Sequence, residues 1–299
     1  REIEEAQPDA LILIDYPGFN LRLAKAVRGR LPRVKIIYYI SPQVWAWNRG
    51  RIPKMARHLD LMLCIFPFEQ PLYEASGLKT MFVGHPLIDA LAPKVTGAAR
   101  DPQLVGLFPG SREKEVRRIF PTMIETAQRL GSADPSLCFE SAAASEPMAA
   151  LMRELLRAAG KDERWCEVRV GTSQQLMQRA AVGMVASGTA TLEAAYFGMP
   201  LVILYKVAWL TWAVGKRLVR VPFLGMPNIL AEREIAREFL QEAAQPAAIA
   251  EELLRLLRDP AAQEKTRGEL RSVISRLGEP GAGVRAAQAV CSLLAAPAR

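Results

Sequence analysis

Residues 103–112, QLVGLFPGSR, decide the fold prediction, because an apolar run there passes through a proline and a glycine into an amphipathic segment. The run from Gln103 to Phe108 predicts a buried strand, and the segment from Glu113 predicts a helix. A glycine at such a junction lets backbone N–H groups face a ligand, and the helix dipole favours an anion. Arg112 adds a two-pronged donor suited to phosphate. A phosphate-binding turn is therefore predicted, although an ordinary turn with a solvated arginine has the same pattern.

A second turn of this kind follows the predicted strand 182–186, where the sequence is SGTATLE over residues 187–193. Glu193 could accept both hydroxyls of a ribose from the first turns of the following helix. The alternative is that Ser187 or Thr189 only caps that helix. Two anion-ready turns at strand ends favour a nucleotide site. The residues assigned to the nucleotide are Gly110, Ser111, Arg112, Ser187, Gly188, Thr189 and Glu193.

Outward from these turns, short apolar runs alternate with longer amphipathic segments, which predicts an α/β fold with parallel sheets covered by helices. The expected strands are 10–14, 34–40, 60–66, 80–83, 103–108, 137–140, 166–170, 182–186 and 200–204. A helix is expected over 44–58, and helices alone are expected after Glu232. Small residues, glycine and proline at 92–101 mark a boundary. We expect Rossmann-like domains at 1–98 and 99–270, followed by a carboxyl-terminal helix at 271–299 that packs back on the first domain.

Composition limits the function classes. The chain has 299 residues, a formal net charge of +8 and 50% hydrophobic residues, which favours anionic partners such as a nucleotide, a phosphorylated lipid or a membrane surface. Nucleic acid is not expected, since no nucleic-acid-binding motif is present. Four scattered cysteines and two histidines predict a reduced, metal-free cytoplasmic protein. No signal peptide is visible, and the apolar stretches are too short to span a bilayer.

The first half carries weaker candidates. Asp15, in IDYPGFN, is either a general base or a helix cap, and from the residues alone the cap is favoured. Trp45 and Trp47 lie beside Arg49 and Arg51, a combination that suits a sugar, a phosphate or a lipid interface, with at least one ring expected in the core. His85 is either a ligand contact or structural. The apolar, aromatic segment 207–220 is predicted to lie in a membrane surface, line an acyl-chain groove, or pack between the domains.

Seven segments, in this order and spacing, resemble the lipid-A-disaccharide synthase family: IDYPGFN, SPQVWAWNRGRIPKMAR, FPFEQPLYE, FVGHPLIDAL, LFPGSREKEV, ASGTATLEAA and MPNILAEREI. The resemblance implies a two-domain glycosyltransferase of the B type without a metal or other cofactor. It implies inverting transfer of 2,3-diacylglucosamine from its UDP conjugate to the 6-hydroxyl of 2,3-diacylglucosamine 1-phosphate, with release of UDP. Asp15 matches the family's aspartate, Arg112 its diphosphate-binding arginine and Asn228 its donor-site asparagine.

Two features depart from the family pattern. Gly18 stands where many members have a second aspartate, and the family's amino-terminal segment is not present before Arg1. We therefore expect the first domain to be incomplete and activity to need that segment. The resemblance places the enzyme at the inner face of the Gram-negative inner membrane as a peripheral protein and leaves a homodimer open. Other hypotheses are a UDP-GlcNAc epimerase, a peptidoglycan-precursor transferase and a non-catalytic basic protein that binds membranes.

Overall fold

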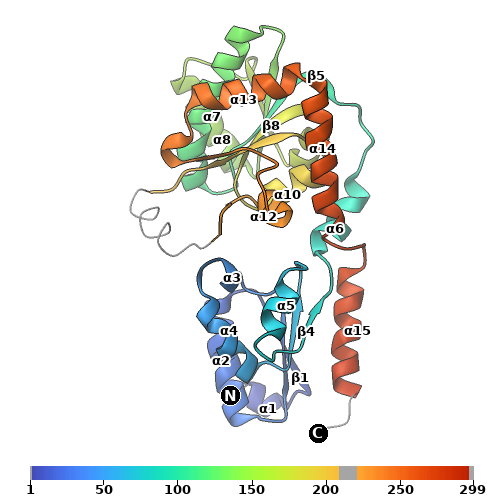
Figure 1. Cartoon of the computed structure of the whole chain (residues 1–299). Coiled ribbons are helices and arrows are strands. Elements are labelled where there is room, and N and C mark those ends of the chain that lie inside the picture. The colour runs from blue at the N-terminus through green and yellow to red at the C-terminus, as the bar shows by residue number, and fades with distance from the viewer. Residues whose placement is uncertain (1, 209–220, 296–299) are drawn as a thin grey trace. The chain divides into compact units, whose positions relative to one another are not determined.

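The computed structural model describes residues 2–208 and 221–295 (Figure 1). These residues form two compact units, each with its own sheet. Residues 2–90 and 275–295 belong to unit 1, and residues 91–208 and 221–274 belong to unit 2. The apolar, aromatic segment singled out in the sequence lies almost wholly outside the described residues.

Unit 1 is built on four parallel strands in the order β1-β2-β3-β4. The strands are β1 (Ala10–Ile14), β2 (Lys35–Tyr39), β3 (Leu61–Cys64) and β4 (Thr80–Phe82). The helices are α1 (Glu2–Ala6), α2 (Pro17–Arg30), α3 (Val44–Trp47), α4 (Ile52–His58), α5 (Glu69–Glu74), α6 (Pro86–Leu91) and α15 (Ala282–Ala295), with a short 3-10 turn at Arg49–Arg51. A second 3-10 turn, Ala92–Lys94, lies at the start of unit 2.

Alternation along the strands divides the core of unit 1 between the two faces of its sheet. Ile36 and Tyr38 of β2 pack with α2, α4 and α5, whereas Ile37 packs on the opposite face with Ala286 of α15. Helix α15 runs beside the sheet (Figure 1). Its start is fixed because the Asp89 carboxylate accepts hydrogen bonds from the backbone N–H groups of Gly281 and Ala282.

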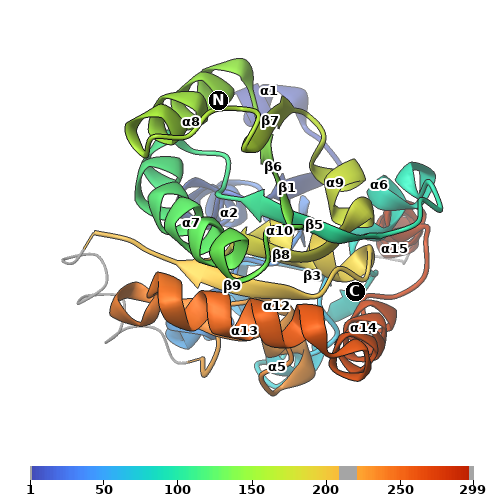
Figure 2. The same ribbon diagram turned by 90° about the horizontal axis from the view of Figure 1, so that it is seen from above.

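Unit 2 is built on six parallel strands in the order β10-β9-β8-β5-β6-β7. They are β5 (Asp101–Phe108), β6 (Cys138–Ala143), β7 (Cys166–Val170), β8 (Ala180–Ala186), β9 (Leu201–Tyr205) and β10 (Glu238–Leu240). Helices α7 (Glu113–Ala133), α8 (Glu146–Ala158) and α13 (Pro246–Arg258) share one core with the sheet, and Figure 2 shows α7 and α13 side by side. Helices α9 (Ser173–Arg179) and α10 (Thr189–Tyr196) contact the strands from the other face, and α12 (Met226–Ala231) packs on α10. Helix α14 (Pro260–Ser275) follows α13, and a 3-10 turn occupies Gln241–Ala243.

All nine predicted strands are present within a few residues of their expected bounds, but two predictions were wrong. The chain after Glu232 is not only helical, because β10 pairs with the Ile203–Tyr205 part of β9. Three residues are too few to show a period of two, so only the neighbouring strand reveals this one. The helix expected over 44–58 is interrupted at Asn48 (φ −148°, ψ 57°), and Pro53 then lies in the first turn of α4.

None of the helices in residues 2–208 and 221–295 is both long and apolar enough to cross a bilayer.

Candidate functional site

The two predicted phosphate-binding turns of unit 2 lie at a point where the strand order reverses. From β5 the chain adds β6 and β7 on one side, then returns to place β8, β9 and β10 on the other. Leu107 of β5 pairs with Met184 of β8, and Phe108 pairs with Val185, so the carboxyl ends of both strands adjoin. Open α/β sheets bind ligands at such a switch point. The topology therefore brings both turns to the expected ligand position.

A cavity of about 330 Å³ lies between these turns. Its volume is at the lower end of the roughly 300 to 1,000 Å³ usual for small-molecule sites. The structure brings all seven predicted nucleotide residues of the two turns to its lining: Gly110, Ser111, Arg112, Ser187, Gly188, Thr189 and Glu193. Residues from two further segments complete the lining, among them Ala142 of β6 and Ser173 and Met177 of α9.

The backbone of both turns requires glycine. Gly110 has φ 106° and Gly188 has φ 154°, values that L side chains rarely adopt. A Cβ atom on Gly110 would also lie 2.6 Å from Oε2 of Glu115. Helix α7 begins directly after the first turn, so its unsatisfied N–H groups and positive dipole end face the cavity side of the turn. The Arg112 side chain is 82% exposed and forms a 3.0 Å ion pair with Glu115, a surface pair that an anion can replace at little cost.

Helix capping does not account for the polar side chains of these turns. The N-cap residues of α7 and α10 are Arg112 and Gly188, and neither helix has a side-chain cap hydrogen bond. The Ser187 hydroxyl instead donates to the carbonyl of Leu224 at 3.1 Å. Glu193 accepts a 3.2 Å hydrogen bond from Gln174, which holds its carboxylate at the cavity wall.

Asn228 was predicted to contact the donor, but the structure does not bring its side chain to this cavity. The residue is fully buried, and its amide donates to the Ala236 carbonyl and to Glu238. Its Oδ1 accepts from the N–H groups of Ile235 and Ala236. Glu238 also accepts a hydrogen bond from the N–H of Leu224, and the Leu224 carbonyl accepts one from Ser187. Asn228 is therefore linked to the cavity only through these other residues.

In unit 1, Asp15 stands on a left-handed turn directly after β1. Asp15 (φ 48°) and Tyr16 (φ 41°) both have positive φ, which costs on the order of 1 to 3 kcal/mol for each non-glycine residue. Asn20 donates to the carbonyls of Ile14 (3.0 Å) and Asp15 (2.7 Å), and the Tyr38 hydroxyl donates to the Asp15 carbonyl. Burial raises the pKa of Tyr38 to about 12, so this donor keeps its proton.

The Asp15 carboxylate is exposed and does not act as the helix cap that the sequence favoured. The N-cap of α2 is Tyr16, and the helix start has no side-chain cap hydrogen bond. Two side chains, Asn20 and Tyr38, thus hold a strained turn through three hydrogen bonds, and the Asp15 carboxylate itself is free to contact a ligand. Backbone strain of this kind concentrates at functional sites.

The loops after β2 and β3 are tied together by Glu69, a residue to which the sequence assigned no role. Its buried carboxylate accepts hydrogen bonds from the Ser41 hydroxyl, from Trp45 Nε1 at 2.9 Å and from the backbone N–H of Phe66 at 3.1 Å. Burial raises the pKa of Glu69 to about 7, against the opposing effect of these donors. Its place shortly after the apolar strand expected over 60–66, within FPFEQPLYE, was the available signal.

The tryptophans and arginines of the first half have different environments. Trp45 is 4% exposed and packs edge-on against Phe68, with ring centres 4.9 Å apart, as expected for at least one ring in the core. Trp47 is 44% exposed, and the Arg51 guanidinium lies 5.1 Å from its ring centre. Arg49 is exposed and donates to the Trp45 carbonyl at 3.2 Å. Trp47, Arg49 and Arg51 are the members of this group that a ligand can reach.

His85 is half-buried and holds a fixed tautomer. Its Nδ1 accepts from the N–H of Leu87 at 3.0 Å, so in the neutral ring Nε2 carries the proton. Burial lowers the pKa of His85 to about 4, which keeps the ring neutral near pH 7. His85 follows β4 and Asp15 follows β1, so their strands are three spacings, roughly 14 Å, apart. Among residues 2–208 and 221–295, no three or more His, Cys, Asp or Glu side chains cluster so as to hold a metal ion.

Solved structures with this arrangement include nucleotide-sugar enzymes. The MnaA protein of S. aureus, solved with UDP, aligns with a TM-score of 0.64 at 12% identity, over 98% of this chain and 78% of that one. The pneumococcal O-GlcNAc transferase GtfA, solved with UDP and GlcNAc, aligns with a TM-score of 0.58 at 13% identity, over 99% of this chain and 59% of that one. At these identities the likeness shows the fold alone, which is the B-type glycosyltransferase fold with two Rossmann-like domains.

Sequence relatives are more specific. Residues 1–290 match the model of the lipid-A-disaccharide synthetase family. Lipid-A-disaccharide synthase of Geobacter sulfurreducens is 43% identical over 295 residues, which cover 96% of this chain and 76% of the relative. The synthase of Persephonella marina is 38% identical over 309 residues, covering 98% and 80%. The chain therefore belongs to the lipid-A-disaccharide synthetase family and is a glycosyltransferase, so the alternative functions considered from the sequence are not favoured.

Proposed function

We propose that this chain transfers 2,3-diacylglucosamine from UDP-2,3-diacylglucosamine to the 6-hydroxyl of 2,3-diacylglucosamine 1-phosphate. The observation that carries the proposal for the donor is the cavity at the strand-order reversal, where two glycine turns, Arg112 and Glu193 converge. The diphosphate meets the start of α7 and the Arg112 guanidinium, and Glu193 accepts the ribose hydroxyls. Asn228 supports this site through Glu238 rather than by touching the sugar.

Asp15 is the proposed general base. In an inverting transfer the acceptor hydroxyl loses its proton as its oxygen attacks the anomeric carbon, and the bond from that carbon to the UDP oxygen breaks with its electron pair. The proton goes to the Asp15 carboxylate, and Arg112 stabilises the negative charge that UDP takes away. An exposed carboxylate on a turn held by Asn20 and Tyr38 suits this task, and neutral His85 with its proton on Nε2 is better suited to donate a hydrogen bond.

We further infer that Trp47, Arg49, Arg51 and His85 belong to the acceptor or membrane side, and that the enzyme is a peripheral protein on the cytoplasmic face of an anionic inner membrane. The net charge of +8 supports attraction to such a surface. The transfer needs no metal or other cofactor in this proposal, since Arg112 supplies the positive charge at the diphosphate. Full activity in the presence of EDTA is the expected result.

Mass spectrometry of the products tests the reaction. The chain, completed with the family's amino-terminal segment that activity is expected to need, is mixed with UDP-2,3-diacylglucosamine and 2,3-diacylglucosamine 1-phosphate. The expected products are a disaccharide 1-phosphate and UDP in equal amounts. Formation of UDP without disaccharide would indicate hydrolysis. Recovery of an epimerised UDP-sugar would show that the reaction is an isomerisation and not a transfer. Either outcome would overturn the proposal.

A further inference from the structure

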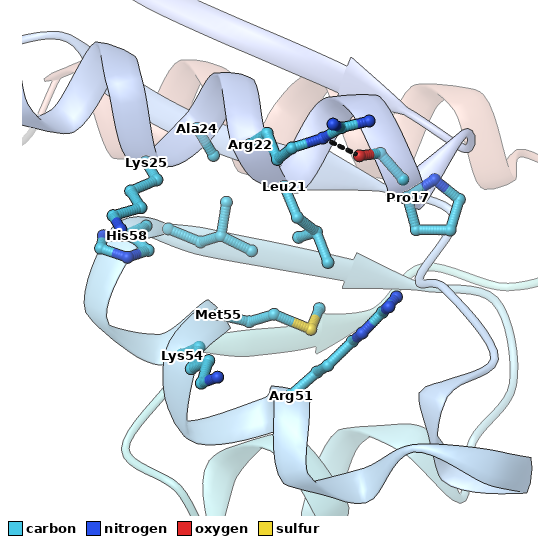
Figure 3. A pocket seen from close by; sticks show the side chains of 11 residues that line it. Pro17, Leu21, Arg22, Ala24, Lys25, Arg51, Lys54, Met55 and His58 are labelled. Carbon is cyan, nitrogen blue, oxygen red and sulfur yellow. Dashed lines mark hydrogen bonds between the residues drawn. The ribbon is translucent and has the colours of Figure 1, made fainter.

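A groove between α2 and α4 of unit 1 has a lining of which the proposed roles use only Arg51. It encloses about 500 Å³, within the range usual for small-molecule sites. Leu21 and Met55 point toward each other between the two helices, and Ala24 and Leu59 complete the apolar part of the lining (Figure 3). This groove is larger than the cavity assigned to the nucleotide.

The ionisable side chains on the rim of the groove are all basic. Arg22 and Lys25 come from α2, Lys54 and His58 come from α4, and Arg51 directly precedes α4. The lining contains no aspartate or glutamate. In Figure 3, Arg51 extends toward the Pro17 end of the groove, whereas Lys25 and His58 mark the other end. Uncompensated positive charge around an apolar floor is complementary to an anion that carries an apolar chain.

The electrostatic environment of His58 also shows that the rim of the groove is positively charged. The pKa of His58 is lowered first by burial and then by the charges of Lys25, Arg57 and Arg28. Among the described residues no acidic side chain forms an ion pair with Arg22, Lys25, Arg51 or Lys54, whereas Arg28 nearby is paired with Asp60. Four cations held together in this way gain most from a ligand with more than one negative charge, such as a phosphomonoester.

The groove also begins beside the proposed base. Pro17 and Gly18, which line one end, follow Asp15 and Tyr16 directly in the strained turn. We propose that the groove between α2 and α4 is the acceptor subsite, which holds an acyl chain between Leu21 and Met55 and the phosphomonoester on its basic rim. The subsite takes its ligand class from the proposed function, and it adds Arg22, Lys25 and Lys54 as residues that select a phosphorylated, acylated acceptor.

Equilibrium binding of a soluble probe tests the chemistry without turnover. The probe is dihexanoyl phosphatidic acid below its micelle concentration, compared with dihexanoyl phosphatidylcholine, which lacks the phosphomonoester, and glycerol 3-phosphate, which lacks the chains. The wild-type chain should bind the phosphatidic acid at least tenfold more tightly than either comparison ligand. Arg51→Ala with Lys54→Ala should weaken that binding at least tenfold, and Leu21→Gln should weaken it through the apolar floor.

The matched control is Arg33→Ala with Lys79→Ala, which removes one arginine and one lysine that are exposed on unit 1 outside the groove. The control should bind the phosphatidic acid as the wild type does. UDP affinity and melting temperature, measured for every variant, show whether each is folded. Equal binding by the groove variant and the control, or no preference for the phosphatidic acid, would overturn the subsite.

Steady-state kinetics show whether the groove is occupied by the acceptor or by a lipid of the bilayer. With the acceptor as occupant, Arg51→Ala with Lys54→Ala raises the KM for the acceptor at least tenfold over the control and leaves the KM for the UDP-sugar unchanged. An acceptor KM equal to that of the control, together with a greater loss of binding to anionic vesicles, would make the groove a membrane site and overturn the proposal. Absence of disaccharide in the wild type would count against the proposed function. The comparison of phosphatidic acid with the two other ligands would still show whether the groove binds a phosphorylated, acylated molecule.

Discussion

The Asp15 carboxylate depends on residues that lie far from it in the sequence. Its position after β1 follows from the apolar strand pattern, so Asp15 could be predicted as a candidate. The contact with Tyr38, 23 residues away, and the left-handed turn that Tyr38 and Asn20 stabilise could not be predicted, because no local sequence pattern encodes them. The same holds for Glu69, whose partner Ser41 lies 28 residues earlier. Sequence patterns locate a strand end, whereas the hydrogen bonds that orient a side chain there come from other strands.

Asp15→Asn should lower turnover by roughly 10²- to 10⁴-fold, since the amide keeps the size of the side chain but cannot take the acceptor's proton. UDP affinity and melting temperature should stay near the wild-type values, because the Asp15 side chain caps no helix. Initial rates of disaccharide formation measure the effect. The matched control is Asp9→Asn, an exposed carboxylate just before the other end of β1. Normal turnover in Asp15→Asn would remove this residue from the mechanism.

Glu69 should give the protein a measurable loss of stability as pH rises. Its folded pKa of about 7 lies above the ordinary value of 4.5, so between these values the folded state holds more protons than the unfolded state. Stability from this group is therefore present at low pH and is lost as pH rises through about 7. Relative to Glu69→Gln, the wild type should lose about 2 kcal/mol between pH 5 and pH 8. Urea unfolding of both proteins at several pH values measures the difference, and parallel curves would contradict it.

At the scale of elements, the two turns at the ends of β5 and β8 were predictable because each carries its own signal of strand, glycine and helix. Their adjacency was not, since it depends on β8 pairing with β5 rather than with β7, which precedes it in the chain. Strand β10 was missed for a related reason, because its three residues become a strand only through pairing with β9. Local propensity predicts the elements, and the strand order that assembles the cavity is a property of the whole sheet.

The two turns should contribute differently to nucleotide binding. Arg112→Ala should weaken UDP and pyrophosphate alike, by about 10- to 100-fold, because a charge-assisted phosphate contact is worth roughly 1.5 to 3 kcal/mol. Glu193→Ala should weaken UDP more than pyrophosphate, since only UDP carries a ribose. Calorimetric titration with both ligands measures these effects, with Arg129→Ala near the far end of α7 as the matched control. Equal losses of both ligands in Glu193→Ala would show that Glu193 does not touch the ribose.

Asn228 should act as a structural residue of the α12 to β10 connection. Asn228→Ala would leave the N–H groups of Ile235 and Ala236 and the Ala236 carbonyl without their buried partner. At about 1 to 3 kcal/mol for each unsatisfied group, the loss of unfolding free energy should be at least about 3 kcal/mol. Urea unfolding and UDP-sugar titration measure stability and affinity separately. A variant of normal stability that lost UDP-sugar affinity would instead indicate direct contact with the donor.

At the scale of the whole molecule, the net charge of +8 and the specific groove make separate contributions to lipid binding. Attraction to an anionic bilayer sums over basic residues near its surface, each worth about 1 kcal/mol, and is screened within a Debye length. That length falls from about 10 Å at 0.1 M salt to about 3 Å at 1 M. The chain should therefore float with phosphatidylglycerol vesicles at low salt, dissociate at high salt, and ignore phosphatidylcholine vesicles at both.

The charge-removal variants distinguish this surface attraction from the groove. Arg51→Ala with Lys54→Ala and Arg33→Ala with Lys79→Ala each remove two positive charges. Flotation at about 0.01 M salt should decrease for both by similar amounts, because a Debye length of about 30 Å makes the attraction depend on total charge more than on position. Binding of monomeric dihexanoyl phosphatidic acid should decrease only for the first pair, because a bound phosphomonoester needs donors within hydrogen-bond reach. Vesicle flotation measured beside the monomer titration tests both statements on the same preparations. A wild-type chain that stays in solution beside anionic vesicles at low salt would disprove the membrane attraction of these residues, and the groove would then have to bind its ligand without help from a charged surface.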